Sequence, residues 1–507
     1  MKILSSTHKR EADKITIERE HIQSIELMER AAKAIAVWLQ KKFNKYTSFI
    51  FFIGSGNNGG DGLAVARLLA EKKYKVKVFL SEVKISDDAQ KNLEKLKNFD
   101  AVKITQLSEN EKLPPIFKQS VVIDALFGSG LNRPIQGYLK EIVNHINKSN
   151  ATVVAIDIPS GLKSDYAPED CTFLSNEVIV RANITLALET PYLSFFFPES
   201  GKYVGKWHIL HIGLDTKFIS QIKTPYFCNT RDFIVGKIRK REKFTHKGSY
   251  GHGLLIGGSY GKMGAAILST RAAIKTGAGL ISAHIPECGY NIMQIAIPEA
   301  MVSIDKYQKI VSEFPNLSSF NAVAIGPGLG KSNATASCLK DLFEKCKNSI
   351  PMVIDADALN ILSDNPEFLN YIPKDTILTP HPKELDRIVG VASNSVERNK
   401  NLVELATKYH IFVILKGHHT AIATPDGNCF FNITGNPGMA TGGSGDVLTG
   451  MILSLLAQGY SPFDASVLGV YLHGLAGDIA ADLISEEALD ASSIINNIGA
   501  AFKDSKI

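Results

Sequence analysis

Short apolar runs rich in valine, isoleucine and phenylalanine alternate with longer amphipathic runs along most of the chain. Such runs are typical of strands buried on both faces of a parallel sheet, and helices connect strands of this kind. The alternation therefore predicts an α/β protein with doubly wound, largely parallel sheets, whose ligands bind beyond the carboxyl ends of the strands. The expected strands are residues 49–53, 76–80, 121–124, 153–157 and 184–188 in the first half and residues 254–256, 322–325, 352–355, 376–379 and 411–415 in the second.

One stretch interrupts this alternation. Residues 214–245 lack clear periodicity and contain the basic run 237–243. We interpret the run as part of a solvated linker rather than as a binding patch. A chain of 507 residues is too long for one ordinary core. We therefore predict two α/β domains, residues 1–213 and residues 246–507, joined by the linker at 214–245.

The composition is that of an ordinary soluble protein, with 45% hydrophobic and 21% charged residues. A net charge of +5 is small for this length and does not demand a nucleic-acid partner. None of the six cysteines forms a C-x-x-C pair, which favours reduced thiols. The N-terminus lacks the apolar core of a signal peptide, and no apolar run approaches the length of a membrane span. We expect a cytoplasmic homo-oligomer without nucleic-acid or membrane partners.

Near the C-terminus, a glycine-rich stretch leads directly into an apolar helix. Gly442, Gly443 and Gly445 let the backbone approach a ligand and point successive N–H groups at it. The apolar run 447–456 places those N–H groups at the positive end of a helix, which suits a phosphate. Asp446 stands at the edge of this anion hole, where a carboxylate could take a proton from an attacking hydroxyl. A mobile linker is the alternative, but a single acid entering an apolar helix is poor linker composition.

A second glycine-rich loop follows the strand at 49–53. It contains a formal G-x-G-x-x-G pattern, which on its own is a weak indication of a dinucleotide site. Asn57, Asn58 and Asp61 bring oxygen atoms into the space that a pyrophosphate would fill. These side chains look more like ligands for a polar substrate or a hard cation.

Further polar residues follow other strands of the first half. Asp124 and Asp157 each end a buried strand, and Ser160 lies just beyond the second. Because parallel strands end at the same edge of a sheet, these residues and Asn58 can converge in one pocket. The alternative for each aspartate is a turn or a helix cap.

Strands of the second half also end in small and polar residues. Lys416 and Gly417 at a strand end suit a phosphate. Asp355 could instead bind only backbone N–H groups, and His381 could be a histidine satisfied within its turn. We do not interpret the adjacent histidines 418 and 419 as a metal site, and we expect the apolar helix at 464–483 to be core.

Together these residues resemble the family of bifunctional NAD(P)H-hydrate repair enzymes, in which an NAD(P)HX epimerase domain is fused to an ADP- or ATP-dependent NAD(P)HX dehydratase domain with a ribokinase-like fold. The matching motifs are residues 56–62 (GNNGGDG), 124–130 (DALFGSG) and 157–161 (DIPSG), then 246–248 (HKG), 257–259 (GGS), 326–330 (GPGLG), 355–360 (DADALN), 379–384 (TPHPKE), 416–420 (KGHHT) and 442–448 (GGSGDVL). They span nearly the whole chain in the family's order. Ser444 and Ser129 stand where threonine is expected, and both keep a hydroxyl.

The resemblance implies a reaction for each half. Reduced nicotinamide rings hydrate slowly at C6, giving R and S forms that dehydrogenases do not use. The first domain, Rossmann-like, would interconvert these forms of NADHX and NADPHX. The second would dehydrate the S form with ADP or ATP, because phosphorylation turns hydroxide into phosphate, a better leaving group. The expected cofactors are a potassium ion and the adenine nucleotide, with magnesium accompanying the nucleotide.

The resemblance also implies a role for individual residues. Asp446 would be the base on the C6 hydroxyl, and Asp157 the acid/base of epimerisation, although a substrate-orienting Asp157 would look the same in sequence. The expected potassium ligands are Asn58, Asp124 and Ser160, all oxygen donors. The expected substrate contacts are Asn57, Asn58, Gly59, Gly60, Asp61, Gly128, Ser129, Gly130, Leu131, Asn132, Arg133, Pro134, Asp157, Ala265, Gly328, His381 and Asp446. The expected nucleotide contacts are Lys416, Gly417, His418, His419, Thr420 and Gly445.

Two alternatives remain at this point. A ribokinase-like vitamin or sugar kinase would carry a similar glycine–aspartate anion hole, but simple kinases of that fold lack a domain like the first half. A non-enzymatic scaffold would have lost the catalytic acids, whereas Asp124 and Asp157 are both present.

Overall fold

The computed structural model describes residues 1–81, 84–109, 111–131, 134–166, 178–347 and 350–506. The chain divides into two compact units, an N-terminal unit of residues 2–224 and a C-terminal unit of residues 225–507 together with Met1. The division falls inside the segment 214–245 that was predicted as a linker. That segment carries secondary structure of its own, so it is not an extended connection.

Among its described residues, the N-terminal unit contains one seven-stranded sheet, and every pair of neighbouring strands is parallel. In spatial order the strands are β3 (Lys103–Gln106), β2 (Lys75–Leu80), β1 (Ser48–Ile53), β4 (Ser120–Ala125), β5 (Thr152–Ile156), β6 (Ile184–Leu188) and β7 (Lys206–Leu210). The α-helices are α1 (Ser6–Glu20), α2 (Ser24–Lys42), α3 (Asn57–Glu71), α4 (Asp87–Lys97), α5 (Gly137–Lys148), α6 (Pro198–Val204) and α7 (Thr216–Gln221). The predicted doubly wound parallel sheet is confirmed.

The two faces of this sheet have separate cores. Phe49, Phe51 and Ile53 of β1 pack with residues of α2, α3 and α4. The alternate residues Ile50 and Phe52 pack with α5 on the other face. This alternation is what a strand covered on both sides requires, since successive side chains point to opposite faces.

The first glycine-rich loop is shorter than the sequence suggested, because α3 begins at Asn57. Its glycines permit close backbone contact. A Cβ on Gly54 would lie 1.8 Å from the carbonyl oxygen of Leu126, and one on Gly59 would lie 2.1 Å from that of Gly54. A larger residue at either position would push the start of α3 away from the strand ends.

The described part of the C-terminal unit contains a ten-stranded sheet. In spatial order the strands are β11 (Met301–Ile304), β10 (Leu280–Ile285), β9 (His252–Ile256), β12 (Ala322–Ile325), β13 (Met352–Ile354), β14 (Ile377–Leu378), β15 (Phe412–Leu415), β16 (Ala421–Ala423), β17 (Cys429–Asn432) and β8 (Tyr226–Asn229). Strand β16 is antiparallel to both neighbours, and the other pairs are parallel. The α-helices are α8 (Arg231–Val235), α9 (Met263–Thr276), α10 (Tyr290–Ala296), α11 (Asn333–Cys346), α12 (Asp357–Asp364), α13 (Pro382–Val389), α14 (Ser395–Tyr409), α15 (Ser444–Ala457), α16 (Pro462–Ile484) and α17 (Ala491–Asp504).

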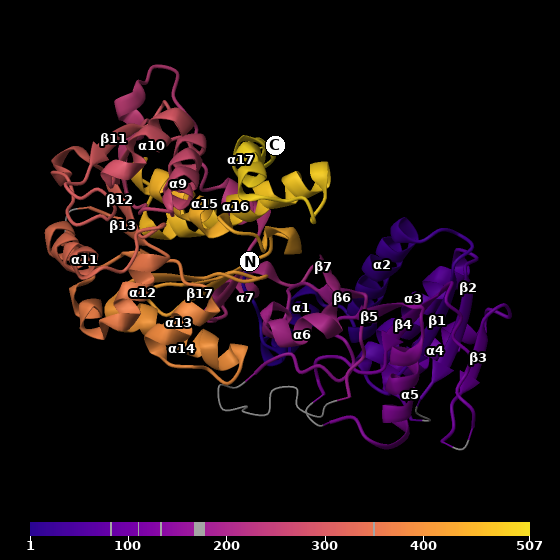
Figure 1. The fold of residues 1–507 in the computed structure, drawn as a ribbon. Coiled ribbons are helices and arrows are strands. Elements are labelled where there is room, and N and C mark those ends of the chain that lie inside the picture. Colours follow the sequence, from indigo (N-terminus) through magenta and orange to yellow (C-terminus); the bar gives the residue numbers. More distant parts are fainter. Residues whose placement is uncertain (82–83, 110, 132–133, 167–177, 348–349, 507) are drawn as a thin grey trace. The chain divides into compact units, whose positions relative to one another are not determined.

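The core of the C-terminal unit lies around α15. Figure 1 shows α9, α15, α16 and α17 gathered in one layer, with α12, α13 and α14 on the other side of the strands. These four helices and one face of the sheet share a continuous apolar cluster. By length and composition α16 could cross a membrane. Most of it is buried in this cluster, so internal packing accounts for its apolar residues, as expected for a core helix.

Candidate active sites

A cavity of about 660 Å³ lies at the carboxyl ends of the parallel strands of the N-terminal unit. It opens between the start of α3, the loop after β4 and the residue that follows β5. The predicted substrate residues on its wall are Asn57, Asn58, Asp61, Gly128, Ser129, Gly130, Leu131 and Asp157. The sheet therefore brings these residues together, although they come from three separate loops.

Other predicted contacts lie elsewhere. Gly59 and Gly60 are buried in the first turns of α3, where a Cβ on Gly60 would lie 2.7 Å from the Cε of Met28. Pro134 is exposed. Asn132 and Arg133 lie outside the described residues.

Asp157 has an unusual backbone conformation. Its φ of 64° is in the left-handed region, which a non-glycine residue adopts only when its surroundings enforce it. One carboxylate oxygen, Oδ2, accepts a hydrogen bond of 2.7 Å from the hydroxyl of Tyr192, and Oδ1 accepts a longer one of 3.4 Å from the backbone N–H of Leu188. Asp157 is therefore held firmly at the wall of the cavity.

Two of the predicted potassium ligands, Asp124 and Ser160, do not line this cavity, whereas the third, Asn58, does. Asp124 and Ser160 are fully buried, and Ser160 Oγ donates a hydrogen bond of 2.6 Å to Asp124 Oδ1. Burial raises the pKa of Asp124 to about 6, although hydrogen bonds from Ser160 and Leu126 oppose the shift. The side-chain amide of Asn58 is buried with an unpartnered nitrogen. The unpartnered atom of Asn58 is a hydrogen-bond donor and not a cation ligand, while Asp124 and Ser160 satisfy each other, so the potassium site stays a prediction.

A second cavity, of about 500 Å³, lies in the C-terminal unit between the start of α9 and the start of α12. The predicted residues Ala265, Gly328 and Asp446 line it. Gly328 has a φ of 63°, and a Cβ there would lie 2.4 Å from the carbonyl oxygen of Lys262. The remaining lining residues are Gly261, Lys262, Gly264, Ala356, Asp357, Asn360 and Glu384.

Asp446 lies in the first turn of α15. The helix begins at Ser444, whereas the apolar run predicted to form it begins at residue 447. The helix is preceded by Gly443 with a φ of 90°, and no side chain caps this end. The first N–H groups of α15 are thus open to an anion. Burial raises the pKa of Asp446 to about 7; the nearby charge of Asp355 adds to the shift, and Lys416 opposes it.

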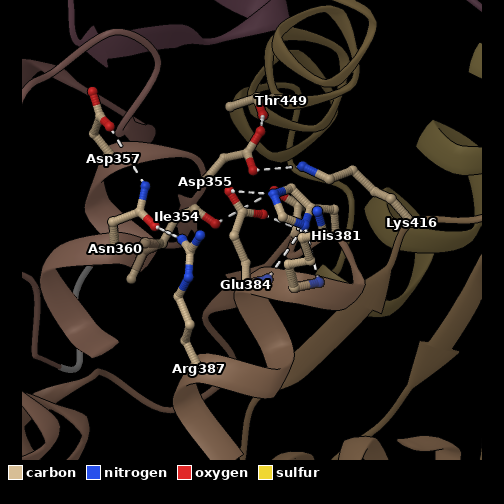
Figure 2. A network of polar contacts seen from close by, with 11 residues as sticks. Ile354, Asp355, Asp357, Asn360, His381, Glu384, Arg387, Lys416 and Thr449 are labelled. Atoms are coloured by element: carbon tan, nitrogen blue, oxygen red, sulfur yellow. Dashed lines mark hydrogen bonds and ion pairs between the residues drawn. The ribbon is translucent and has the colours of Figure 1, made fainter. Parts of the chain in front are cut away.

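A polar network connects this helix to the loop after β15 (Figure 2). The buried carboxylate of Asp355 accepts a hydrogen bond of 2.8 Å from Lys416 Nζ and one of 2.6 Å from Thr449 Oγ1 on α15. A Cβ on Gly445 would lie 3.3 Å from the same lysine nitrogen. Asp355 therefore does more than cap backbone groups, because it fixes Lys416 beside the start of α15.

The predicted nucleotide residues after Lys416 form the turn between β15 and β16. The hydroxyl of Thr420 closes the turn by donating to the carbonyl oxygen of Gly417 at 3.1 Å. His419 is mostly buried, which lowers its pKa to about 4, and its Nδ1 lies 3.0 Å from the carbonyl oxygen of Asn432. The neighbouring His418 is exposed. The turn thus presents Gly417 and His418 outward.

His381 caps the N-terminus of α13. Its Nδ1 accepts hydrogen bonds from the backbone N–H groups of Lys383 and Glu384, at 3.1 and 3.3 Å. Glu384 in turn accepts from the backbone N–H of His381 at 2.8 Å. Because Glu384 lines the cavity and His381 does not, the histidine supports the wall from one side (Figure 2).

Comparison with known proteins places this geometry in a family. Residues 24–194 match the family described as YjeF-related protein N-terminus, and residues 253–499 match the family described as NAD(P)H-hydrate dehydratase. The bifunctional NAD(P)H-hydrate repair enzyme of Moorella thermoacetica is 33% identical, over 98% of this chain and 96% of its own length. This chain belongs to the family of bifunctional NAD(P)H-hydrate repair enzymes.

Two solved structures resemble the C-terminal unit of this chain. A ribokinase-like superfamily protein from Enterococcus faecalis is 28% identical, covers 56% of this chain and 98% of its own, and has a TM-score of 0.50. The ADP/ATP-dependent NAD(P)H-hydrate dehydratase of Bacillus subtilis, co-crystallised with ATP and Mg²⁺, is 30% identical over 55% of this chain and 98% of its own, with a TM-score of 0.48. The likeness to the Enterococcus protein confirms the ribokinase-like fold of the C-terminal unit.

Membership of the repair enzyme family also separates the two readings of the second half. The relative from Moorella aligns with both units, whereas a simple kinase would align with the second alone. The family assignment therefore favours the repair enzyme over a vitamin or sugar kinase.

Sequence reasoning missed several residues of the first site, and it interpreted His473 and Asp478 of the second unit as part of a core helix. Lys9 and Asp13 of α1 line the first cavity, as does Tyr192. In the second unit, His473 Nε2 lies 3.4 Å from Ser444 Oγ, and Asp478 binds the backbone N–H of Gly435 at 2.9 Å. The only signal for the α1 pair was two charged residues on the helical face of the buried Ala12, and for the α16 pair two polar residues within an apolar helix.

Proposed function

We propose that this chain repairs hydrated nicotinamide cofactors, with one reaction in each unit. The N-terminal unit would interconvert the R and S forms of NADHX and NADPHX. The C-terminal unit would return the S form to NADH or NADPH at the expense of ADP or ATP. The observation that carries the proposal is the presence, in one chain, of two cavities that are each bordered by the motif residues of a different family domain.

Epimerisation needs a group that can move a proton at C6. That carbon carries both the hydroxyl and the ring nitrogen, so the nitrogen lone pair assists loss of the hydroxyl once an acid protonates it. Water can then add to the planar cation from either face, and a base takes its extra proton. Asp157, held by Tyr192 at the wall of the first cavity, is our candidate for the base.

Dehydration in the second cavity would use phosphoryl transfer. Asp446, with a pKa of about 7, is poised to take the proton from the C6 hydroxyl. The uncapped N–H groups at the start of α15 would hold the transferred phosphoryl group. Loss of phosphate and of a ring proton then restores the reduced nicotinamide, with AMP formed from ADP or ADP from ATP.

The nucleotide would lie against the turn after β15. Lys416 is fixed there by Asp355, and its ammonium group beside Gly445 suits a phosphate. Gly417 to Thr420 supply the small and polar surface next to it. Magnesium would accompany the phosphates, since it is bound through one or two carboxylates together with phosphate oxygens. Asp357 at the cavity wall is the carboxylate that fits this role.

Potassium would occupy the group formed by Asn58, Asp124 and Ser160. A cation there would compensate the buried carboxylate of Asp124 and order the loops after β1, β4 and β5 that make the wall of the first cavity. The ion would therefore act on epimerisation by shaping the cavity.

The direct test is to incubate the full chain with mixed NADHX epimers and ADP or ATP. We expect the near-UV absorbance of reduced nicotinamide to return completely, because the R form is drawn through the S form. Without nucleotide the absorbance should stay low. Return of only the S fraction would contradict the epimerase assignment, and no return at all would contradict the dehydratase assignment.

The same reaction tests whether the nucleotide is consumed. If Asp446 and the start of α15 carry out phosphoryl transfer, one AMP and one phosphate should form from ADP for each NADH. An aspartate alone contributes only about 10²- to 10⁴-fold through acid/base help and leaves hydroxide a poor leaving group. A nucleotide-to-NADH ratio far below one-to-one would contradict phosphorylation and favour direct protonation of the hydroxyl.

A further inference from the structure

Helix α1 contributes two charged side chains to the first cavity. Lys9 and Asp13 are one helical turn apart and both line it. Lys9 is only 7% exposed. None of the motifs that identify the family includes these residues, and the match to the N-terminal family domain begins only at residue 24.

Lys9 is held by contacts on several sides. Its ammonium group donates hydrogen bonds to the carbonyl oxygens of Leu188 and Thr190, at 3.1 and 2.6 Å. It lies 3.8 Å from Asp157 Oδ1 and 3.5 Å from the centre of the Tyr192 ring. Burial lowers the pKa of Lys9 to about 8, while the charge of Asp157 opposes the shift. The lysine thus keeps its positive charge at neutral pH.

Lys9 and Tyr192 contact different oxygens of the Asp157 carboxylate. It receives the hydroxyl of Tyr192 on one oxygen and faces Lys9 with the other. The carboxylate is therefore held between a hydroxyl donor and an ammonium group.

The surroundings of Asp13 favour its protonated form. Burial raises its pKa to about 7, the charge of Asp157 raises it further, and Lys9 opposes both. The charged and titratable groups around it are Lys9 and Arg10 of α1, Asp61 of α3, Asp157 after β5, and Glu189 and Tyr192 after β6. Close to neutral pH, Asp13 therefore readily keeps its proton, and burial raises the pKa of the neighbouring Asp61 as well.

We infer that α1 completes the epimerase site, with Asp13 as a second catalytic residue and Lys9 as the residue that positions Asp157. The inference rests on the proposed function of the N-terminal unit. Asp13 would donate its proton to the C6 hydroxyl. The C6–O bond then breaks, its electron pair leaves with the water formed, and the ring nitrogen lone pair makes a double bond to C6. A water molecule adds to the other face, and Asp157 takes its proton; exchange with solvent returns that proton to Asp13.

The test of Asp13 uses three variants of the full chain. We expect Asp13→Asn to slow epimerisation by about 100-fold or more, the contribution of a lost acid/base group. Asp13→Glu should restore most of the rate. Glu11→Gln is the matched control, because Glu11 is an exposed acid of the same helix. Dehydration of pure S-NADHX, measured in the same samples, should be unchanged in all three.

A pH profile distinguishes a proton donor from a structural residue. Because Asp13 must carry its proton, kcat/KM for epimerisation should fall as the pH rises above about 7, the pKa of this carboxyl group. The residual activity of Asp13→Asn should lack that fall. Lys9→Gln removes the charge that holds down the pKa of Asp13, so the fall should move to higher pH and kcat should drop more than KM changes.

The outcomes separate the two levels of the argument. If the unaltered chain does not interconvert the epimers, the proposed function is wrong. If it does, but Asp13→Asn keeps the rate and the alkaline fall, the role of Asp13 is wrong. If thermal unfolding shows that Asp13→Asn does not fold, the pH profile of Asp13→Glu decides instead. The inference would be overturned if epimerisation by Asp13→Glu fell at the same pH as in the unaltered chain and if Lys9→Gln also left the profile unchanged.

Discussion

At the scale of single residues, the surroundings of Asp446 set its chemistry. The positive end of α15 favours the ionised carboxylate. Burial and the carboxylate of Asp355 favour the protonated form and outweigh this effect, since the pKa rises to about 7. A carboxyl group whose pKa lies near neutral pH is well suited to be a general base. Such a base must be ionised before the reaction and must hold the proton afterwards.

This pKa predicts the pH dependence of dehydration. Asp446 must be ionised to accept the proton of the C6 hydroxyl, so activity is lost as the carboxylate is protonated. We expect kcat/KM for S-NADHX, at saturating nucleotide, to fall about tenfold for each pH unit below about 7 and to be level above it. Initial rates in buffers of constant ionic strength measure this. A level profile down to a pH of about 5 would contradict a basic role for Asp446.

Asp124 provides a prediction about potassium. In Asp124→Ala the proposed ion loses its only charged ligand, and we expect its affinity to weaken at least about tenfold. Potassium should then neither raise the unfolding temperature of the N-terminal unit nor activate epimerisation at concentrations that act on the unaltered chain. Asp100→Ala, at an exposed position, is the control. An unchanged potassium response in Asp124→Ala would exclude this ligand assignment.

A functional residue could be predicted from the sequence when its neighbours in the sequence also form its surroundings in the structure. Asp157 directly follows a buried strand, and Asp446 follows Gly445 at the start of a helix, so a few neighbouring residues in the sequence indicate their surroundings. Lys9 and Asp13 reach Asp157 from a different helix, and only the folded unit brings them together. His381 remained ambiguous because a capping histidine and a ligand have the same sequence pattern.

At the scale of elements, the sequence pattern was informative where the apolar run was long. The central strands of both sheets and the helices α2, α15 and α16 were predictable for this reason. Strand β8 was not, because its four residues lie at a sheet edge, where fewer neighbours demand apolar side chains. The start of α3 was also missed, since glycines that normally break helices serve there as sites of close backbone contact.

The start of α15 gives a prediction at this scale. Gly443 has a φ of 90°, and a Cβ would also lie 2.5 Å from Leu268 Cδ1. Gly443→Ala should lower the free energy of unfolding of the C-terminal unit by about 1–2 kcal/mol, the cost of a left-handed non-glycine residue, and should raise KM for the nucleotide. Gly442→Ala is the control for stability, because nothing lies within 4 Å of its added Cβ. Equal unfolding free energies in denaturant titrations would show that the strain is relieved.

At the scale of the whole molecule, carboxylates line both cavities, but the groups beside them differ. The first cavity gathers carboxylates, which suit proton transfer and a bound cation. The second places helix N–H groups and Lys416 where phosphates would lie. The two cavities lie in separate units, and each unit has its own core.

This division predicts that the two activities are lost separately. Asp446→Asn should lower dehydration by about 10²-fold or more while R and S forms still equilibrate, because removing one acid/base group affects only its own site. Asp157→Asn should do the reverse and leave dehydration of pure S-NADHX intact. Chromatographic separation of the epimers measures the first activity, and near-UV absorbance the second. Each variant is the folding control of the other, since both keep one full activity. If either folded variant lost both reactions, the sites would be coupled, and the assignment of one reaction to each unit would be wrong.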